Sequence, residues 1–352
     1  MKRILMFQDY FYKGGIEKVI LDIRNNISND YNVDILTMVN KSDEKIISLL
    51  NKDYQKLFKR AFFGLKKLHI FIKNNYTKYD IMHIHCYNSF GLIYAFIASR
   101  YFNKIIVHAH NCNIDRDFLY IKHMLNSIIK RIFKRKKYIY IAVSDDCNNF
   151  CFSSKRAIII PNGIDYHKYY YNSKKREKYR EKFNIKNNEI VIGNIGRFNE
   201  QKNHQFIIKV FNEINKHSNN YKLILIGEGI LKNNILNDIK KKKLSSKVIV
   251  LDNRNDIPDL INMYDIFLFP SIYEGFGIAV VENEVNGKYV FVSDNVPKSV
   301  NISSRFVSLS LKKSELEWAN EIMNIKDKEL ILNKKLDIKY FIDYLEKIYS
   351  DV

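Results

Sequence analysis

The segment of residues 270–282, PSIYEGFGIAVVE, has residue types that suit the binding of a polar, anionic ligand. Glu274 and Glu282 supply carboxylates, which accept hydrogen bonds strongly from hydroxyl groups. Gly275 and Gly277 let the backbone approach a ligand, and the amides at the start of the helix that follows favour anions. The alternative explanation is that Glu282 is one of several exposed acids on a helix.

A second group of polar residues, GRFNEQKN at 196–203, follows the first predicted strand of the second half. Arg197 offers a planar fork of donors and Lys202 a compact positive charge, and both bind phosphate when they lie at a strand end. In a chain with 58 Lys and Arg, either residue alone would be explained as surface decoration. Their shared placement makes them candidates for a diphosphate site.

The first half has two further candidate positions. Gly14 and Gly15 follow the first predicted strand, where the amides at a helix start can approach phosphates, although such a pair can equally be a simple turn. His110 and Asn111 close another strand. A histidine at a strand end is often only a partly buried polar residue, and that alternative stays open.

Alternating strands and helices must position these residues. Short runs rich in Ile and Val, each followed by a turn and an amphipathic segment of helical length, predict parallel βαβ units and an α/β class. Ligands gather at the carboxyl ends of such strands. The predicted strands are Arg3–Phe7, Val33–Val39, Ile81–Cys86, Ile105–His110, Tyr138–Ser144 and Ala157–Ile160, then Ile190–Ile195, Lys222–Ile226, Val248–Leu251, Ile266–Pro270 and Tyr289–Ser293.

The length of 352 residues favours two domains. We expect an N-terminal domain at 1–168, a C-terminal domain at 169–335, and a last helix at 336–352 that crosses back to the first domain. The charged stretch Lys174–Lys182 is expected to be the linker between them. No apolar run is long enough to span a bilayer and the first residues do not form a signal peptide, so we expect an intracellular protein.

Four cysteines without CxxC spacing suggest neither a zinc site nor a disulfide framework, and we expect buried or partly buried thiols. The net charge of +20 lies mainly in residues 1–165, which have 27 Lys and Arg against 14 Asp and Glu. A positive surplus favours nucleic acid or an acidic lipid surface, while genome composition is the alternative cause. The basic run Lys130–Lys137 and the segment Phe62–Lys67 would both suit an anionic membrane, or be solvated helix ends.

These motifs together resemble the family 4 retaining glycosyltransferases (GT4) of GT-B architecture, such as bacterial enzymes of exopolysaccharide, capsule and O-antigen synthesis. The likeness rests on the E-x7-E arrangement after Pro270-Ser271, on the G-R-x4-K element at Gly196, and on the Gly14-Gly15 turn. It implies two Rossmann-like, doubly wound domains that face each other across a cleft, with the acceptor bound by the first domain and the nucleotide sugar by the second.

The resemblance also implies roles for individual residues. Glu274 would bind the donor sugar, together with Gly275, Phe276 and Gly277, and Glu282 would bind the ribose. The diphosphate would be held by Gly14, Gly15, Arg197 and Lys202. His110 would be a catalytic residue alongside Glu274, and Asn111 would lie on the acceptor side.

The implied activity is a metal-independent, retaining transfer, of hexosyltransferase type, from a donor expected to be a UDP-sugar to a lipid-linked or saccharide acceptor. No cofactor is expected, since the nucleotide sugar is a substrate. Asp115-Arg116-Asp117 has the D-x-D pattern of another glycosyltransferase architecture, but we reject a metal role, because Arg197 and Lys202 can supply the positive charge. We expect a cytoplasmic protein, peripheral on the inner face of the cytoplasmic membrane, with no nucleic acid bound.

Two other functions fit parts of the sequence. A protein that binds or epimerises a nucleotide sugar would have the same fold without the transfer. A basic nucleic-acid-binding protein is supported by charge alone, because no known nucleic-acid-binding signature is present.

Overall fold

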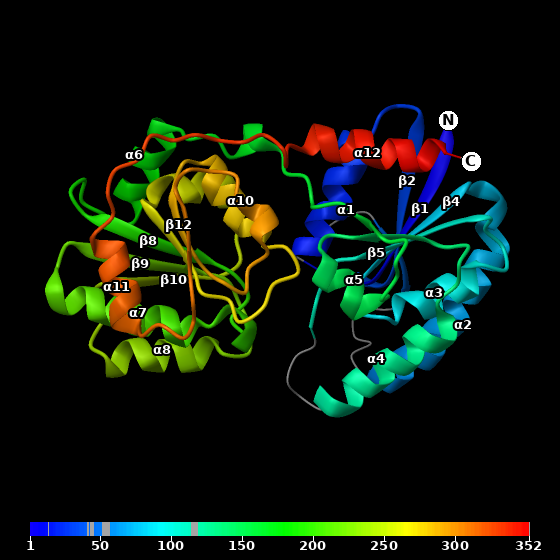
Figure 1. Cartoon of the computed structure of the whole chain (residues 1–352), viewed down its shortest axis with the longest axis horizontal. Coiled ribbons are helices and arrows are strands. Elements are labelled where there is room, and N and C mark those ends of the chain that lie inside the picture. The colour runs from blue at the N-terminus through cyan, green and yellow to red at the C-terminus, as the bar shows by residue number, and fades with distance from the viewer. Residues whose placement is uncertain (13, 41, 43–45, 51–56, 114–118, 352) are drawn as a thin grey trace. The chain divides into compact units, whose positions relative to one another are not determined.

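A computed structural model of the chain describes all residues except 13, 41, 43–45, 51–56, 114–118 and 352, and divides into two compact units (Figure 1). Unit 1 consists of Met1–Gly163 and Ile338–Val352, and unit 2 of Ile164–Asp337. Each unit is built around its own sheet and is described separately below.

The sheet of unit 1 has seven strands in the order β3-β2-β1-β4-β5-β6-β7, and all of its pairings are parallel. Its central strands are apolar and buried, as expected of a parallel sheet covered on both faces. The strands are β1 (Lys2–Phe11), β2 (Tyr31–Asn40), β3 (Ile47–Leu50), β4 (Ile81–Cys86), β5 (Lys104–Ala109), β6 (Ile139–Ala142) and β7 (Ile158–Ile159).

Helices cover both faces of this sheet (Figure 1). Helices α1 and α12 contact each other on one face, and α2, α3 and α4 lie on the other. The helices of unit 1 are α1 (Gly15–Asn26), α2 (Leu57–Asn75), α3 (Gly91–Ala98), α4 (Leu119–Phe133), α5 (Asp145–Cys151) and α12 (Ile338–Ser350), with a 3₁₀ turn η1 (Tyr76–Lys78).

The sheet of unit 2 has six parallel strands in the order β10-β9-β8-β11-β12-β13. Strands β8 and β11 are neighbours although they are far apart in the sequence, so the order reverses beside β8. The strands are β8 (Ile190–Ile195), β9 (Tyr221–Ile226), β10 (Val248–Leu251), β11 (Ile266–Phe269), β12 (Tyr289–Ser293) and β13 (Phe306–Leu309).

The helices of unit 2 also cover both faces of their sheet, with α7, α8 and α11 on one and α10 on the other (Figure 1). The single tryptophan, Trp318 on α11, is fully buried in the core of this unit. The helices are α6 (Ser173–Lys182), α7 (His204–His217), α8 (Lys232–Lys241), α9 (Ile257–Leu260), α10 (Ile278–Val285) and α11 (Glu315–Met323), with 3₁₀ turns η2 (Tyr166–Lys168), η3 (Glu200–Lys202), η4 (Ile261–Met263) and η5 (Lys298–Val300).

The prediction of two doubly wound α/β sheets in series is confirmed, and nearly every predicted strand is present within a few residues. Two short edge strands, β3 and β13, were not predicted. The expectation of a linker at Lys174–Lys182 is wrong, because that stretch is helix α6 of unit 2. Arg176 donates to Asp265 at 2.6 Å, and buried Arg180 donates to the carbonyl of Met263 at 3.1 Å, so α6 is anchored by its charges.

The chain passes between the units at two places that lie beside each other. Ile164 forms a parallel bridge with Asp337, and its amide donates to the carbonyl of Leu336 at 2.9 Å. After this point α12 packs in unit 1, where Lys2 donates to the carbonyl of Tyr349 at 3.1 Å. The two ends of the chain therefore lie together in one unit (Figure 1).

Two sequence expectations concern features of the whole chain. Within the described part of the chain, we find no helix with the length and apolar character needed to cross a membrane. All four cysteines are free thiols, as expected; Cys86, Cys147 and Cys151 are buried and Cys112 is partly exposed.

Candidate functional site

The two motifs of unit 2 lie together because the strands that carry them are neighbours. The Arg197 motif follows β8 and the Glu274 motif follows β11, and the carboxyl ends of adjacent parallel strands meet at one edge of a sheet. Backbone and side-chain bonds join the loops: Ile272 N donates to the carbonyl of Gln201 at 2.8 Å, and Gln201 Nε2 donates to the carbonyl of Tyr273 at 3.0 Å. The two motifs are one structural assembly.

Two more hydrogen bonds fix the start of the Glu274 loop. Asn203 Nδ2 donates to the carbonyl of Pro270 at 3.2 Å, and Ser293 Oγ donates to the carbonyl of Ser271 at 2.5 Å. Ser271 is itself fully buried. Such bonds hold a polar loop in one conformation before a ligand arrives, which reduces the entropy lost on binding.

Lys202 and Glu274 form an ion pair at the centre of this assembly. Lys202 Nζ lies 2.5 Å from Glu274 Oε1, and the side chains are 17% and 7% exposed. The ammonium also lies 4.5 Å from the centre of the Phe269 ring, a cation–π contact. A partly buried cation and a buried carboxylate therefore stand side by side at the edge of the sheet.

Arg197 lies in the same loop, and its side chain is exposed. The loop after β9 supports this segment: Phe198 N donates to the carbonyl of Glu228 at 2.8 Å, and Leu231 N to the carbonyl of Phe198 at 3.0 Å. Phe198 is fully buried, so it anchors the loop beside Arg197.

The Glu274 loop ends at Gly277, which caps helix α10 with φ of 100°. A side chain is strained at this angle, so glycine is required by the backbone. Gly277 has no side chain that could bond the first amides of α10, and its carbonyl accepts from Val280 N at 2.9 Å. The amides of Ile278 and Ala279 are therefore the donors of this helix start that suit an anion. Gly275 is buried, and Phe276 has its ring in the interior at 3% exposure.

Glu282 is not one of a set of exposed helix acids, since its side chain is only 5% exposed. Its neighbour Glu284 is fully buried and accepts hydrogen bonds from the amides of Ile302 and Ser303 at 3.0 and 2.9 Å. Burial raises the pKa of Glu284 to about 8. Glu284 thus fastens a loop, and Glu282 is the acid of α10 that remains a candidate for ligand binding.

Gly14 and Gly15 of unit 1 form the N-terminus of α1, directly after β1. A Cβ atom on Gly14 would lie 2.6 Å from Oε2 of Glu17, so the absence of a side chain is what allows Glu17 to turn inward. Glu17 is 3% exposed, and burial raises its pKa to about 8. The carboxyl group of Glu17 is therefore mainly protonated at neutral pH, a property that no pattern in the sequence indicates.

His110 follows β5 and is 8% exposed. Its Nε2 lies 3.0 Å from Nδ1 of His85 on β4, and its amide donates to the carbonyl of Cys86 at 2.9 Å. The next residue, Asn111, is turned into its own loop, because its side chain donates to the carbonyl of Asn113 at 2.8 Å and accepts from the amide of Cys112 at 3.0 Å. His110 is therefore held by its ring and its backbone.

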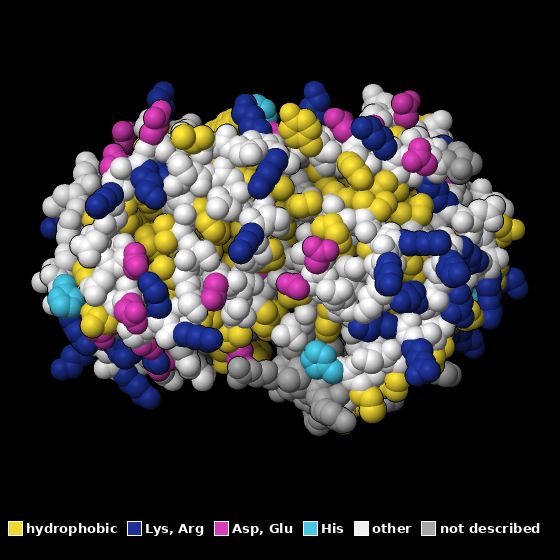
Figure 2. Space-filling view, in the orientation of Figure 1, with side chains coloured by type: hydrophobic (Ala, Val, Ile, Leu, Met, Phe, Trp, Pro, Cys, Tyr) yellow, Lys and Arg dark blue, Asp and Glu magenta, His cyan; other side chains and the backbone are white. Residues whose placement is uncertain are grey.

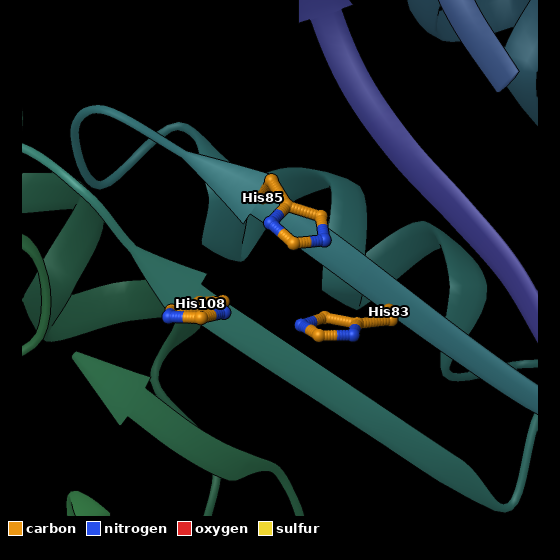
Figure 3. Close-up of side chains that lie close together, drawn as sticks. All are labelled: His83, His85 and His108. Atoms are coloured by element: carbon orange, nitrogen blue, oxygen red, sulfur yellow. The ribbon is translucent and has the colours of Figure 1, made fainter. Parts of the chain in front are cut away.

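Three more histidines lie beside His110 on the same face of the sheet (Figure 3). His85 and His108 are paired across β4 and β5, and His83 bonds the hydroxyl of Tyr349 through Nδ1 at 2.7 Å. Burial lowers the pKa of all four, to about 3 for His83 and His110. The rings are therefore neutral in the folded chain. This cluster was not predicted from the sequence, although the alternation of histidines with period two in two predicted strands could have indicated it.

His83, His85 and His108 each have a ring nitrogen within 4.8 Å of the others, a spacing that draws attention to metal binding. However, the rings of His83 and His85 are stacked, with centroids 4.2 Å apart and planes 23° apart. An imidazole ligates a metal in its own ring plane, so stacked rings do not point at one ion. Asp115 and Asp117 of the D-x-D pattern lie outside the described residues.

Comparison with known proteins covers both halves of the chain. Residues 13–168 match the family model described as Glycosyltransferase Family 4, and residues 175–336 match the model described as Glycosyl transferases group 1. Together these two models extend over unit 1 without its first strand and last helix, and over nearly all of unit 2.

Several curated proteins are similar over much of their length. The EpsF protein of Bacillus subtilis (strain 168) is 26% identical over 91% of this chain and 87% of its own length. The O-antigen biosynthesis glycosyltransferase WclY of Escherichia coli is 26% identical over 81% of this chain and 78% of its own. A UDP-Gal:alpha-D-GlcNAc-diphosphoundecaprenol alpha-1,3-galactosyltransferase of Escherichia coli is 24% identical over 49% of this chain and 46% of its own.

Among solved structures, that of Anabaena Alr3699/HepE in complex with UDP and glucose matches with a TM-score of 0.80. It covers all of both chains at 18% sequence identity. This likeness confirms the two-domain GT-B fold that the sequence predicted.

Proposed function

Since the chain belongs to the family 4 and group 1 glycosyltransferases, we propose that it transfers a sugar from a nucleoside diphosphate donor to a lipid-linked or saccharide acceptor, with retention of configuration. The donor site is in unit 2, at the carboxyl ends of β8 and β11. The reaction belongs to the synthesis of a cell-surface polysaccharide, as it does for WclY, an O-antigen biosynthesis glycosyltransferase by name.

One observation carries this proposal: Lys202 and Glu274 lie 2.5 Å apart at an edge where exposed Arg197 is also placed. A nucleotide sugar has its hydroxyl-bearing ring directly attached to a diphosphate. A cation beside a carboxylate matches that order of groups, with Lys202 and Arg197 on the phosphates and Glu274 on the sugar hydroxyls. Each side chain of the ion pair then exchanges its partner for a group of the ligand.

Uridine is the proposed base, and Glu282 the proposed ligand of the ribose hydroxyls. The support for uridine is the UDP bound in the HepE structure and the UDP-linked donor named for the galactosyltransferase relative. Glu282 suits the ribose because it is a buried acid one helical stretch beyond Glu274. Gly275, Phe276 and Gly277 contribute backbone groups beside the sugar.

No metal or cofactor is part of the proposed reaction. Charge that develops on the leaving diphosphate would be met by Arg197, Lys202 and the first amides of α10, which are fixed before the reaction begins. No side chain of the chain is proposed as a covalent nucleophile. The departing phosphate itself is the proposed acceptor of the proton from the attacking hydroxyl. The hydroxyl then attacks the sugar from the same face that the phosphate leaves.

In unit 1 we assign phosphate binding to the amides at Gly14 and Gly15 and a catalytic role to His110. The N-terminus of α1 presents donors that no capping side chain of Gly14 can satisfy. His110 is neutral at pH 7, since burial lowers its pKa to about 3, so it can donate or accept one hydrogen bond without carrying charge. Asn111 is assigned to the acceptor side.

The proposed location is the cytoplasmic face of the membrane, where a lipid-linked acceptor would be found. The galactosyltransferase relative has a diphosphoundecaprenol acceptor in its name, which supports a lipid-linked acceptor here. The positive charge of residues 1–165 suits an anionic leaflet better than it suits catalysis on a neutral sugar.

The direct test is incubation of the pure protein with labelled UDP-, GDP- and ADP-sugars and a membrane lipid extract, followed by organic extraction. The proposal predicts label in the lipid fraction with one donor, in the presence of a metal chelator as well as in its absence. Label that stays on the nucleotide as an altered sugar would instead indicate an epimerase. Loss of transfer in chelator would contradict the metal-independent step.

A further inference from the structure

Helix α4 of unit 1 has two apolar faces, and only one of them is buried. The inner face carries Asn126 and Ile129, which are 4% and 7% exposed, and Phe133, whose ring packs edge-on against Phe96 at 5.3 Å. Asn126 fixes the helix in place, since its side chain accepts from Ser89 N at 2.9 Å. These contacts account for the attachment of α4 to unit 1 and leave the opposite side of the helix uncovered.

Five large apolar side chains occupy the outer face, and each is 42–52% exposed: Ile121, Met124, Leu125, Ile128 and Ile132. Four of them follow the spacing i, i+4, i+7 and i+11, which places them in one stripe along a helix. Exposed apolar residues on a soluble protein normally occur singly, and a contiguous stripe marks a surface for interaction. At 15 residues, α4 is about 22 Å long, which suits a helix lying along a surface.

Positive charge lies mainly at the C-terminal end of this stripe. Residues 121–137 include seven Lys and Arg and no Asp or Glu. Arg131, Lys134 and Lys136 are exposed, and Lys134 is fixed by donation to the carbonyl of Ser153 at 3.0 Å. In Figure 2, Lys and Arg side chains gather over unit 1 on the face shown.

The aliphatic stripe and the Lys and Arg residues beside it together favour one kind of partner. A nucleic acid would meet the cations, but it binds unstacked bases on aromatic rings and has no use for five aliphatic side chains. A second copy of the chain would bring two sets of cations together, which is unfavourable. A bilayer with anionic headgroups satisfies both features, because its acyl boundary takes the apolar side chains and its phosphates take the cations.

We propose that α4 docks unit 1 on an anionic bilayer by lying in the interface, with the stripe of Ile121, Met124, Leu125, Ile128 and Ile132 among the acyl chains. The inference rests on the proposed function, since a lipid-linked acceptor explains why a transferase should rest on a membrane. Attraction by charge alone is not sufficient in this proposal, because the apolar stripe is also required. The outer face of α4 is then the surface that faces the lipid.

The test measures co-sedimentation of the purified protein with vesicles of phosphatidylcholine, with and without phosphatidylglycerol. Ile128→Ser/Ile132→Ser is expected to weaken binding to the anionic vesicles roughly tenfold or more, because two apolar side chains that the bilayer would bury are lost. Leu236→Ser/Leu316→Ser is the matched control, since these residues are 42% and 45% exposed on helices of unit 2. The control should bind as the unchanged protein does.

A second pair of variants tests the charges. Arg131→Gln/Lys136→Gln should weaken binding about tenfold, and the control Lys240→Gln/Lys241→Gln, also exposed lysines at a helix end, should have no effect. Added salt should weaken binding without removing the difference between the serine variant and its control, since apolar burial is not screened.

Any of the following results would overturn the inference. The unchanged protein does not bind anionic vesicles, or the Ile128→Ser/Ile132→Ser variant binds them equally well, or an RNA fragment displaces the vesicles while this double substitution has no effect. Self-association that is lost in the serine variant would also contradict it. A thermal response to UDP, measured on every variant, separates the two proposals. Vesicle binding without a UDP response would count against the transferase alone, and a UDP response without vesicle binding against the docking surface alone.

Discussion

Lys202 and Glu274 are 72 residues apart in the chain, yet Nζ of the lysine lies 2.5 Å from Oε1 of the glutamate. The pair joins the loop after β8 to the loop after β11, and both side chains are largely buried. It is therefore a structural bond as well as the proposed meeting point of diphosphate and sugar. Removing one partner leaves the other charge in a poorly hydrated place, and removing both does not.

This relationship predicts non-additive stability changes. Lys202→Ala and Glu274→Ala should each lower the free energy of unfolding by about 2–4 kcal/mol, and the double variant by clearly less than the sum. Urea unfolding followed by the fluorescence of Trp318 reports on unit 2. Additive losses would mean that the two side chains do not interact in solution.

A second prediction concerns acid. The histidines of unit 1 have a pKa of 6.5 when unperturbed, and about 3 for His83 and His110 in the folded chain. The unfolded chain therefore binds more protons below pH 6.5, so stability is complete above that pH and falls as the pH drops toward 3. Each such histidine lowers the free energy of unfolding by about 1.4 kcal/mol for each pH unit of acidification in this range.

His108→Leu tests this account, because both ring nitrogens of His108 are buried without a hydrogen-bond partner among the described residues. Burial lowers the pKa of His108 in the folded chain, so its removal should make the loss of stability below about pH 6 smaller than in the unchanged protein. Unfolding by urea at several pH values, followed by circular dichroism, measures it. The exposed His217→Leu serves as a control, and a His108 variant with the pH dependence of that control would refute the prediction.

A third prediction separates backbone strain from function. Gly277 and Gly287 have φ of 100° and 80°, at the two ends of α10, so alanine at either is strained. Each substitution should lower stability by about 1–2 kcal/mol. Only Gly277→Ala should also weaken the binding of a nucleotide sugar, because it shifts the amides at the helix start. Equal effects on binding by calorimetry would show that Gly277 has no special role.

A fourth prediction distinguishes sugar from nucleotide. Glu274→Gln should weaken the UDP-sugar by about 1.5–3 kcal/mol, the range of a hydrogen bond to a charged group, and leave UDP nearly unchanged. Glu282→Gln should weaken UDP and UDP-sugar alike, because the ribose is common to both. The reverse pattern in calorimetric titrations would exchange or dismiss these two assignments.

The sequence was sufficient to predict the sheets and the placing of the two motifs at strand ends, because buried parallel strands read as apolar runs. It was insufficient for the edge strand β13, which is only partly buried and contains a polar Ser308. It was also insufficient for α6, whose charges resemble those of a linker until Arg176 and Arg180 are seen beside the residues that anchor them. Contacts of charged side chains with residues far away in the sequence leave no pattern in the local sequence.

The same limit applies to the site. Lys202 and Glu274 could each be singled out by motif, but their contact depends on β8 and β11 being neighbours, which the order of elements in the chain does not fix. The burial of Glu17 has no local signal either, because it depends on a contact with Gln8 of β1, whose Nε2 lies 3.4 Å from Oε1 of Glu17.

The central claim is that unit 2 holds a nucleoside diphosphate with its own cations. Isothermal titration of UDP, in the presence of a chelator, into the unchanged protein, Arg197→Ala, Lys202→Ala and the surface control Lys240→Ala tests it most directly. The account predicts that the first two substitutions weaken binding about 10- to 100-fold and that the control does not. Unchanged affinity in both site variants, or binding that needs an added metal ion, would contradict it.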